Sequence, residues 1–127
     1  MNLLLDTHAL LWALGDPARL GARAGSAIRD GRNTVYVSPA SIWEIEIKRA
    51  LGRLEAPDEL LDEIAIARFS PLLVTLEHAH AAGRLPSHHA DPFDRLLIAQ
   101  AQQASLTLVS ADHQFPRYGV DLLSPFE

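Results

Sequence analysis

Four carboxylates lie at or near the ends of apolar runs. Asp6 directly follows a run typical of a buried strand, and Asp112 lies three residues after the end of another. Glu44 lies in a helical segment that follows a third run, and Asp94 opens another helical segment. Ligand sites in open α/β sheets form beyond the carboxyl ends of the strands, so these acids could meet at one edge. Carboxylates there would repel by roughly 4 kcal/mol per pair at 4 Å, and Mg²⁺ held by carboxylates and phosphate oxygens removes that cost. The pattern predicts metal-dependent chemistry on phosphate esters.

Each acid also has a purely structural interpretation. Asp6 could cap the helix that begins at the next residue, and Asp112 could form a turn. Glu44 could pair with Lys48, four residues later on the same helix, for about a few tenths of a kcal/mol. However, isoleucine and tryptophan side chains surround Glu44 in the sequence. An acid among so many apolar side chains needs a partner or belongs to a site.

Asp91 and Asp94 compete for one role. In the run Asp91-Pro92-Phe93-Asp94, the first acid has the position of an N-cap and the second that of the third helical residue. Acids are favoured at both positions by free backbone amides and by the helix dipole. We choose Asp94 as the ligand because it projects from a helix with an apolar face. Asp91 is then the cap, with the option of joining the site.

The histidines and one arginine offer weaker signals. His88 and His89 could bind a transition metal together with a nearby acid. They lie in a segment typical of an exposed loop, and adjacent side chains on an extended chain diverge, so we expect solvated or capping roles. His8 and His113 each lie within two residues of a proposed ligand and are candidates for substrate contacts. Arg95 is expected at the surface rather than on a substrate phosphate.

The composition limits the class of protein. The chain has 127 residues, of which 48% are hydrophobic and 21% charged, as expected for one globular domain spanning 1–127. Without cysteine it can have neither a disulfide nor a thiolate centre. No apolar run approaches ~18 residues, and the N-terminus lacks the features of an export signal, so we expect a cytoplasmic protein that does not enter a membrane. A net charge of −5 means that any nucleic-acid binding must depend on metal ions and local arginines.

Apolar runs alternate with helix-like segments along the chain. Strands separated by helices favour right-handed crossovers and a parallel sheet, so we predict an α/β fold with three layers, α/β/α, in which helices flank a small parallel sheet of four to five strands. Ser38-Pro39 and Asp91-Pro92 are typical helix starts. The expected elements are strand 2–5, helix 7–14, helix 18–30, strand 34–37, helix 39–51, helix 58–69, strand 72–75, helix 76–83, helix 92–104, strand 106–109 and strand 121–123.

Four segments of the chain together resemble a PIN-domain ribonuclease, and more narrowly a VapC-type toxin of a bacterial toxin–antitoxin pair. The resemblance spans essentially the whole chain, and the four motifs occur in the order of that family. The segments are Leu5-Asp6-Thr7-His8-Ala9-Leu10-Leu11-Trp12, Ser38-Pro39-Ala40-Ser41-Ile42-Trp43-Glu44-Ile45-Glu46-Ile47-Lys48, Asp91-Pro92-Phe93-Asp94-Arg95-Leu96-Leu97-Ile98-Ala99-Gln100-Ala101 and Leu108-Val109-Ser110-Ala111-Asp112.

The resemblance implies a site and partners. The family's acids would be carried here by Asp6, Glu44, Asp94 and Asp112, as catalytic and metal-binding residues, with Mg²⁺ or Mn²⁺ as cofactor. It further implies endonucleolytic cleavage of RNA, a homodimer, and a cognate antitoxin whose C-terminal segment occupies the active site.

Two other classes of function remain open on the sequence. The chain could be a catalytically inert protein-interaction module whose acidic cavity binds the arginine of a partner. It could also be an aspartyl-phosphate phosphatase with Asp6 as the nucleophile. Such enzymes usually carry a second acid two residues after the nucleophile, and here that position is His8.

Overall fold

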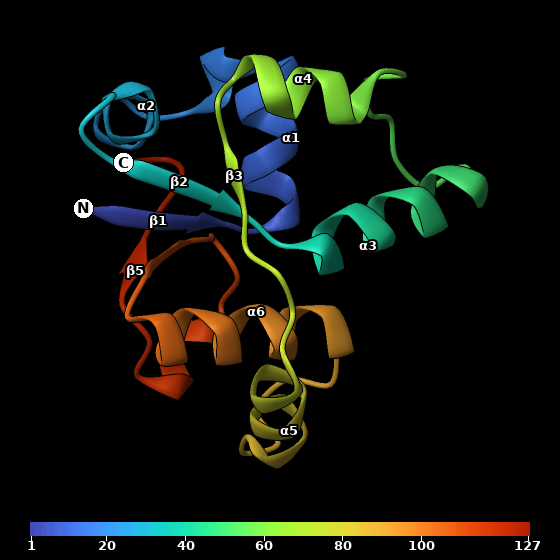
Figure 1. Ribbon diagram of the computed structural model, residues 1–127, viewed down its shortest axis with the longest axis vertical. Helices are drawn as coiled ribbons and strands as arrows, with labels where there is room; N and C mark the ends of the chain where they lie inside the picture. Colours follow the sequence, from blue (N-terminus) through green and yellow to red (C-terminus); the bar gives the residue numbers. More distant parts are fainter.

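Five parallel strands form one sheet at the centre of the computed structural model, which describes all residues from Met1 to Glu127 (Figure 1). The order across the sheet is β3-β2-β1-β4-β5, so β1 lies in the middle. In the register, Leu4 lies between Tyr36 and Leu108. The strands are β1 (Asn2–Leu5), β2 (Thr34–Val37), β3 (Ser70–Pro71), β4 (Thr107–Val109) and β5 (Leu122–Leu123).

Helices cover both faces of the sheet, which confirms the predicted α/β fold with three layers. In Figure 1, α1, α2 and α4 lie above the sheet, α5 and α6 lie below it, and α3 extends from the end of β2. No helix combines the length and the apolar character needed to span a bilayer. The helices are α1 (Thr7–Gly15), α2 (Ala22–Arg29), α3 (Pro39–Ala50), α4 (Leu60–Ile66), α5 (Leu76–Arg84) and α6 (Pro92–Ala104), with 3₁₀ turns η1 (Pro17–Arg19) and η2 (Phe115–Tyr118).

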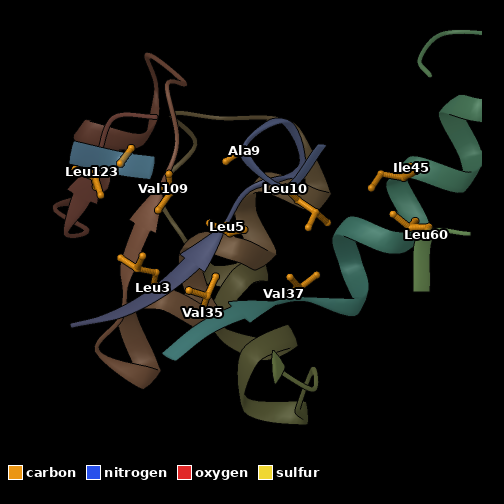
Figure 2. Packing of buried hydrophobic residues seen from close by; sticks show 11 residues of the cluster. Leu3, Leu5, Ala9, Leu10, Val35, Val37, Ile45, Leu60, Val109 and Leu123 are labelled. Carbon is orange, nitrogen blue, oxygen red and sulfur yellow. The ribbon is translucent and has the colours of Figure 1, made fainter. Parts of the chain in front are cut away.

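The central strand is buried on both faces because its side chains alternate between two apolar clusters. Leu3 and Leu5 pack with residues of α1, α2, α3 and α4, as Figure 2 shows in part. Leu4 points to the opposite face and packs with α6 and η2. All three leucines are fully buried. A strand of continuous apolar residues is what a sheet covered on both sides requires, and it fixes the residue that follows it.

The predicted helix 18–30 is wrong, because the chain forms η1, an extended link and then α2. Gly21 has extended backbone angles, and its amide donates to the carbonyl of Pro125 at 2.9 Å. A Cβ at Gly21 would lie 2.1 Å from the backbone carbon of Glu127. The C-terminus packs closely against this glycine, and that long-range contact interrupts the helix.

The predicted strand 72–75 is also wrong, because β3 comprises only Ser70 and Pro71. The amide of Leu72 still donates to Val37 at 2.9 Å, after which the chain leaves the sheet. Thr75 then caps α5 by accepting the amide of His78. The apolar run continues past the sheet edge in exposed positions, so its composition extended the predicted strand too far. The predicted helix 58–69 is likewise longer than α4.

Leu4 should contribute strongly to stability because it is fully buried in the central strand. Leu4→Ala is expected to lower the free energy of unfolding by about 2–5 kcal/mol, from lost burial and a residual cavity. Leu61→Ala, at a side chain that is 67% exposed, should change it by less than about 0.5 kcal/mol. Urea unfolding followed by circular dichroism measures both. Equal effects of the two substitutions would contradict this core.

Candidate active site

Asp6 lies where β1 passes into α1. Its backbone amide donates to Val109 at 3.1 Å, so the residue is fixed against the end of β4. Its Oδ1 accepts the amide of Ala9 at 2.8 Å, which makes Asp6 the N-cap of α1. Burial raises the pKa of the Asp6 carboxyl, and hydrogen bonds from Ala9 and Ser110 oppose that rise only in part. Asp6 is therefore a structural cap and a buried acid at the sheet edge at once.

Glu44 is buried on α3, whose first turn is capped by Ser38. The hydroxyl of Thr7 donates to Glu44 Oε1 at 2.5 Å, and Lys48 Nζ donates to Oε2 at 2.6 Å. The predicted pair with Lys48 is present. Thr7 directly follows Asp6, so its hydroxyl joins the acid on α3 to the start of α1. The hydrogen bond with Glu44 raises the pKa of Lys48, and the negative charges of Asp91 and Asp94 add to this effect.

The capping role for which Asp91 and Asp94 compete belongs to Asp91, as predicted. Asp91 Oδ1 accepts the amides of Phe93 at 2.8 Å and Asp94 at 3.2 Å, so Asp91 caps α6. The Asp94 carboxylate accepts no backbone amide and is 19% exposed. Burial, followed by the nearby charge of Asp91, raises the pKa of Asp94 to about 7. Glu44 and Asp112 also raise it, which shows that these acids lie close enough to repel.

Asp112 follows β4 and is held in a turn. Its amide donates to Ser110 Oγ at 3.1 Å, and its Oδ1 accepts the amide of Gln114 at 2.8 Å. The charge of Asp112 also raises the pKa of Asp6. Asp112 therefore both stabilises the turn and lies at the acidic edge of the sheet.

His89 lies among the acids, although the sequence analysis named it as a possible metal-binding residue and then favoured a solvated or capping role. Its Nε2 lies 3.0 Å from Asp94 Oδ2 and 3.0 Å from Asp112 Oδ2, and its side chain is only 15% exposed. The expectation of a solvated histidine is therefore wrong here. The divergence of adjacent side chains is right, because His88 packs edge-on against Tyr118 instead. Burial lowers the pKa of His89, but the hydrogen bond with Asp112 and the charge of Asp94 outweigh it and leave the pKa raised.

Arg95 explains why the loop places His89 inward. Its guanidinium donates to the carbonyls of Ala82 and Leu85 at 2.8 Å each, of Pro86 at 3.0 Å and of His89 at 3.2 Å. The arginine thus folds the loop between α5 and α6 over the start of α6. These carbonyls occupy the guanidinium, so it is part of the architecture and is not free for a substrate phosphate.

An open cavity of about 440 Å³ lies beside the acids. Carboxylates and aromatic or imidazole rings from distant parts of the sequence share its wall, with the rings of His8 and Trp12 5.8 Å apart. Among its lining residues are Asp6, His8, Trp12, His89, Asp112 and His113. His8 and His113 therefore lie where substrate contacts were expected.

The donor set fits a hard divalent cation. One ligand atom each from His89, Asp94 and Asp112 lie within 4.8 Å of one another. Burial raises the pKa values of Asp6 and Asp94, and the charges of neighbouring acids add to this effect, so a bound cation would stabilise their ionised forms. Glu44 is bound to Thr7 and Lys48 and does not belong to that closest group. Carboxylate oxygens are the ligands that Mg²⁺ and Mn²⁺ prefer.

Comparisons with known proteins identify relatives in sequence and in fold. The chain is 39% identical over 64 residues to Ribonuclease VapC16 of Mycobacterium tuberculosis, a match that covers 47% of this chain and 44% of that protein. In structure it is similar to VapBC2 from Rickettsia felis, solved with a promoter DNA fragment, with a TM-score of 0.70, 16% identity and coverage of 97% and 98% of the two chains.

Two further solved structures share the fold. DNA-bound VapBC from Salmonella typhimurium has a TM-score of 0.67 at 18% identity, covering 97% of each chain. A toxin–antitoxin complex from Klebsiella pneumoniae has a TM-score of 0.64 at 17% identity, covering 98% of each chain. The family model for the PIN domain matches residues 3–121, nearly the entire chain. The chain belongs to the PIN domain family.

Proposed function

We propose that this protein is a metal-dependent endoribonuclease that hydrolyses RNA phosphodiester bonds, and that it is the toxin of a toxin–antitoxin pair. The observation that carries the proposal is the gathering of acids from β1, α3, α6 and β4 at one sheet edge, where burial and mutual repulsion raise the pKa of Asp94 to about 7. Membership of the PIN domain family and the similarity to Ribonuclease VapC16 support it.

The proposed ligands of Mg²⁺ or Mn²⁺ are Asp6, Asp94 and Asp112, with Glu44 acting directly or through water. A bound divalent ion would supply an activated water and stabilise the negative charge that develops on the phosphate. The protein itself fixes the acids by backbone amides at Asp6 and Asp112. Lys48 pairs with Glu44 and places a positive charge beside the proposed metal ligands.

Single-stranded RNA is the proposed substrate. With a net charge of −5, the protein offers little general attraction for phosphates, so local groups must bind the chain. Trp12 lines the cavity, with the Arg19 guanidinium 5.0 Å from its ring. Aromatic rings and arginine planes stack on the unpaired bases of RNA. Such an enzyme would act in the cytoplasm.

The proposed antitoxin would use an apolar groove as well as the acids. A cavity of about 550 Å³ between α3 and α4 is lined mainly by apolar residues, including Ile42, Trp43, Leu61 and Ile64. Trp43 and Leu61 are 66% and 67% exposed. A groove of this kind fits the apolar face of an amphipathic helix, and an arginine of the same partner could pair with the carboxylates. We also propose a homodimer, for which the exposed side chains of Leu73 and Leu76 offer apolar surface.

Asp6→Asn and Asp94→Asn should each reduce Mg²⁺-dependent RNA cleavage by at least ~100-fold, because each removes a charge aimed at the cation. Cleavage of a fluorescent RNA oligonucleotide with and without EDTA measures this, and circular dichroism checks the fold. Asp121→Asn, at an exposed acid outside the cavity, is the matched control. Full activity of either site variant would rule out this scheme. If the wild-type protein binds no Mg²⁺, the alternative function of an inert protein-interaction module is favoured.

Asp94→Asn should also stabilise the metal-free protein at alkaline pH. The folded-state pKa of about 7 exceeds the ordinary value of 3.8, so ionisation of Asp94 costs stability as pH rises from about 4 to 7. Asparagine removes that cost. In EDTA, the Tm of the variant should exceed that of the wild type by several degrees above pH 7, and by much less near pH 4, as scanning fluorimetry can measure. If the gain in Tm instead grows toward acidic pH, ionisation of Asp94 does not destabilise the folded protein.

Leu61→Glu should weaken antitoxin binding by at least ~10-fold, since it places a charge in the apolar groove. RNA cleavage by the isolated protein should remain unchanged, because Leu61 lies outside the acidic cavity. The measurement is the affinity for the product of an adjacent short reading frame, with Leu51→Glu as the control at an exposed leucine outside the groove. Equal binding by wild type and Leu61→Glu would remove the groove from the interface.

A further inference from the structure

We propose that His89 is a positioning residue of the metal site, whose Nε2–H donates to Asp112 and lies against Asp94, and that it is not a metal ligand. The inference rests on the proposed function, because it assigns a role toward the cation that the acids would bind. It concerns a residue that neither the motif spacing nor the acids themselves identify.

The hydrogen bonds of the imidazole fix its tautomer. The backbone amide of Asp91 donates to His89 Nδ1 at 3.1 Å, so Nδ1 must carry a free lone pair. An imidazolium has protons on both nitrogens and could not accept this bond. The ring is therefore neutral with its proton on Nε2, the atom that lies 3.0 Å from Asp94 Oδ2 and Asp112 Oδ2. A histidine nitrogen that binds a metal must be unprotonated, and in this arrangement Nε2 is not.

The loop leaves the ring little freedom to adopt the other tautomer. Arg95 binds the carbonyl of His89 itself and that of Pro86, and the hydroxyl of Tyr118 donates to Pro86 at 2.8 Å. The Asp91 amide that faces Nδ1 belongs to the N-cap of α6 and is fixed with that helix. The backbone therefore holds the Asp91 amide against Nδ1 of His89, so Nδ1 is the acceptor and Nε2 the donor.

The consequence falls on Asp112 and Asp94. Asp112 Oδ1 accepts the amide of Gln114, and Oδ2 accepts Nε2–H of His89, so both oxygens are oriented. Each carboxylate oxygen keeps a second lone pair for a cation. A donor between the two acids also reduces their repulsion when no cation is bound. Outer donors of this kind typically change metal affinity by about 10–100-fold when removed.

The test compares Mg²⁺ and Mn²⁺ binding to the full chain by isothermal titration calorimetry. His89→Ala should weaken the binding of both ions by a similar factor, about 10–100-fold, because it removes a hydrogen-bond donor and not a metal ligand. His89→Gln, whose side-chain amide can still donate, should restore most of the affinity. His88→Ala is the matched control, since that ring packs on Tyr118 away from the acids. Circular dichroism verifies that each variant is folded.

Three results would overturn the inference. If His89→Ala weakens Mn²⁺ far more than Mg²⁺, the imidazole is a ligand, because imidazole suits transition metals and Mg²⁺ prefers oxygen. If His89→Ala leaves the affinities for Mg²⁺ and Mn²⁺ unchanged, His89 does not position the metal-binding acids. In the metal-free wild type, ¹⁵N NMR near about pH 8 should show Nε2 protonated and Nδ1 bare, and the opposite tautomer would contradict the hydrogen bonds. If the wild-type protein binds neither ion, the proposed metal-dependent function is contradicted. The first two results, in contrast, contradict only the role of His89.

Discussion

Burial of carboxylates at one edge of the sheet, together with the repulsion between them, is the constraint on which the rest of this structure depends. Burial raises the pKa values of Asp6 and Asp94, so the fold tolerates this charge at a cost. Two internal groups reduce that cost: Lys48 on Glu44, and His89 between Asp94 and Asp112. A protein rarely maintains such an arrangement for stability alone, since perturbed acids cluster at functional sites. This cost supports the proposal that the acidic edge receives a cation.

The parallel sheet is the device that brings these acids together. Its strands all end at the same edge, so Asp6 and Asp112 meet although 106 positions separate them in the printed sequence. The continuous leucines of β1 pack into both layers, which holds the chain rigidly up to the acid that follows. Rigid elements place site residues more accurately than free loops do. The loop residue His89 needs the four carbonyl bonds of Arg95 to reach comparable order.

The sequence was sufficient wherever local chemistry decides structure. The end of β1 and the caps at Ser38 and Asp91 follow from short patterns that match the structure. The errors fall where distant contacts decide. The C-terminus against Gly21 breaks a helix that composition favours, and β3 ends early despite an apolar run. His89 was expected in a solvated or capping role for the same reason, since the contacts of Arg95 with the carbonyls of α5 and its following loop are not visible in the sequence.

The structural and functional interpretations of the acids are complementary. A carboxylate that accepts a backbone amide has its orientation fixed on one oxygen, while further lone pairs remain for a cation. Asp6 and Asp112 both use this arrangement. Asp91 takes the capping task at α6 entirely, with two amides on one oxygen, and this leaves the Asp94 carboxylate free of the backbone. Burial and the nearby charge of Asp91 then raise the pKa of Asp94 to about 7, with no backbone amide on its carboxylate to oppose them. The separation of cap and site acid in the Asp91-Pro92-Phe93-Asp94 run thus places the least compensated carboxylate where a cation is most strongly attracted.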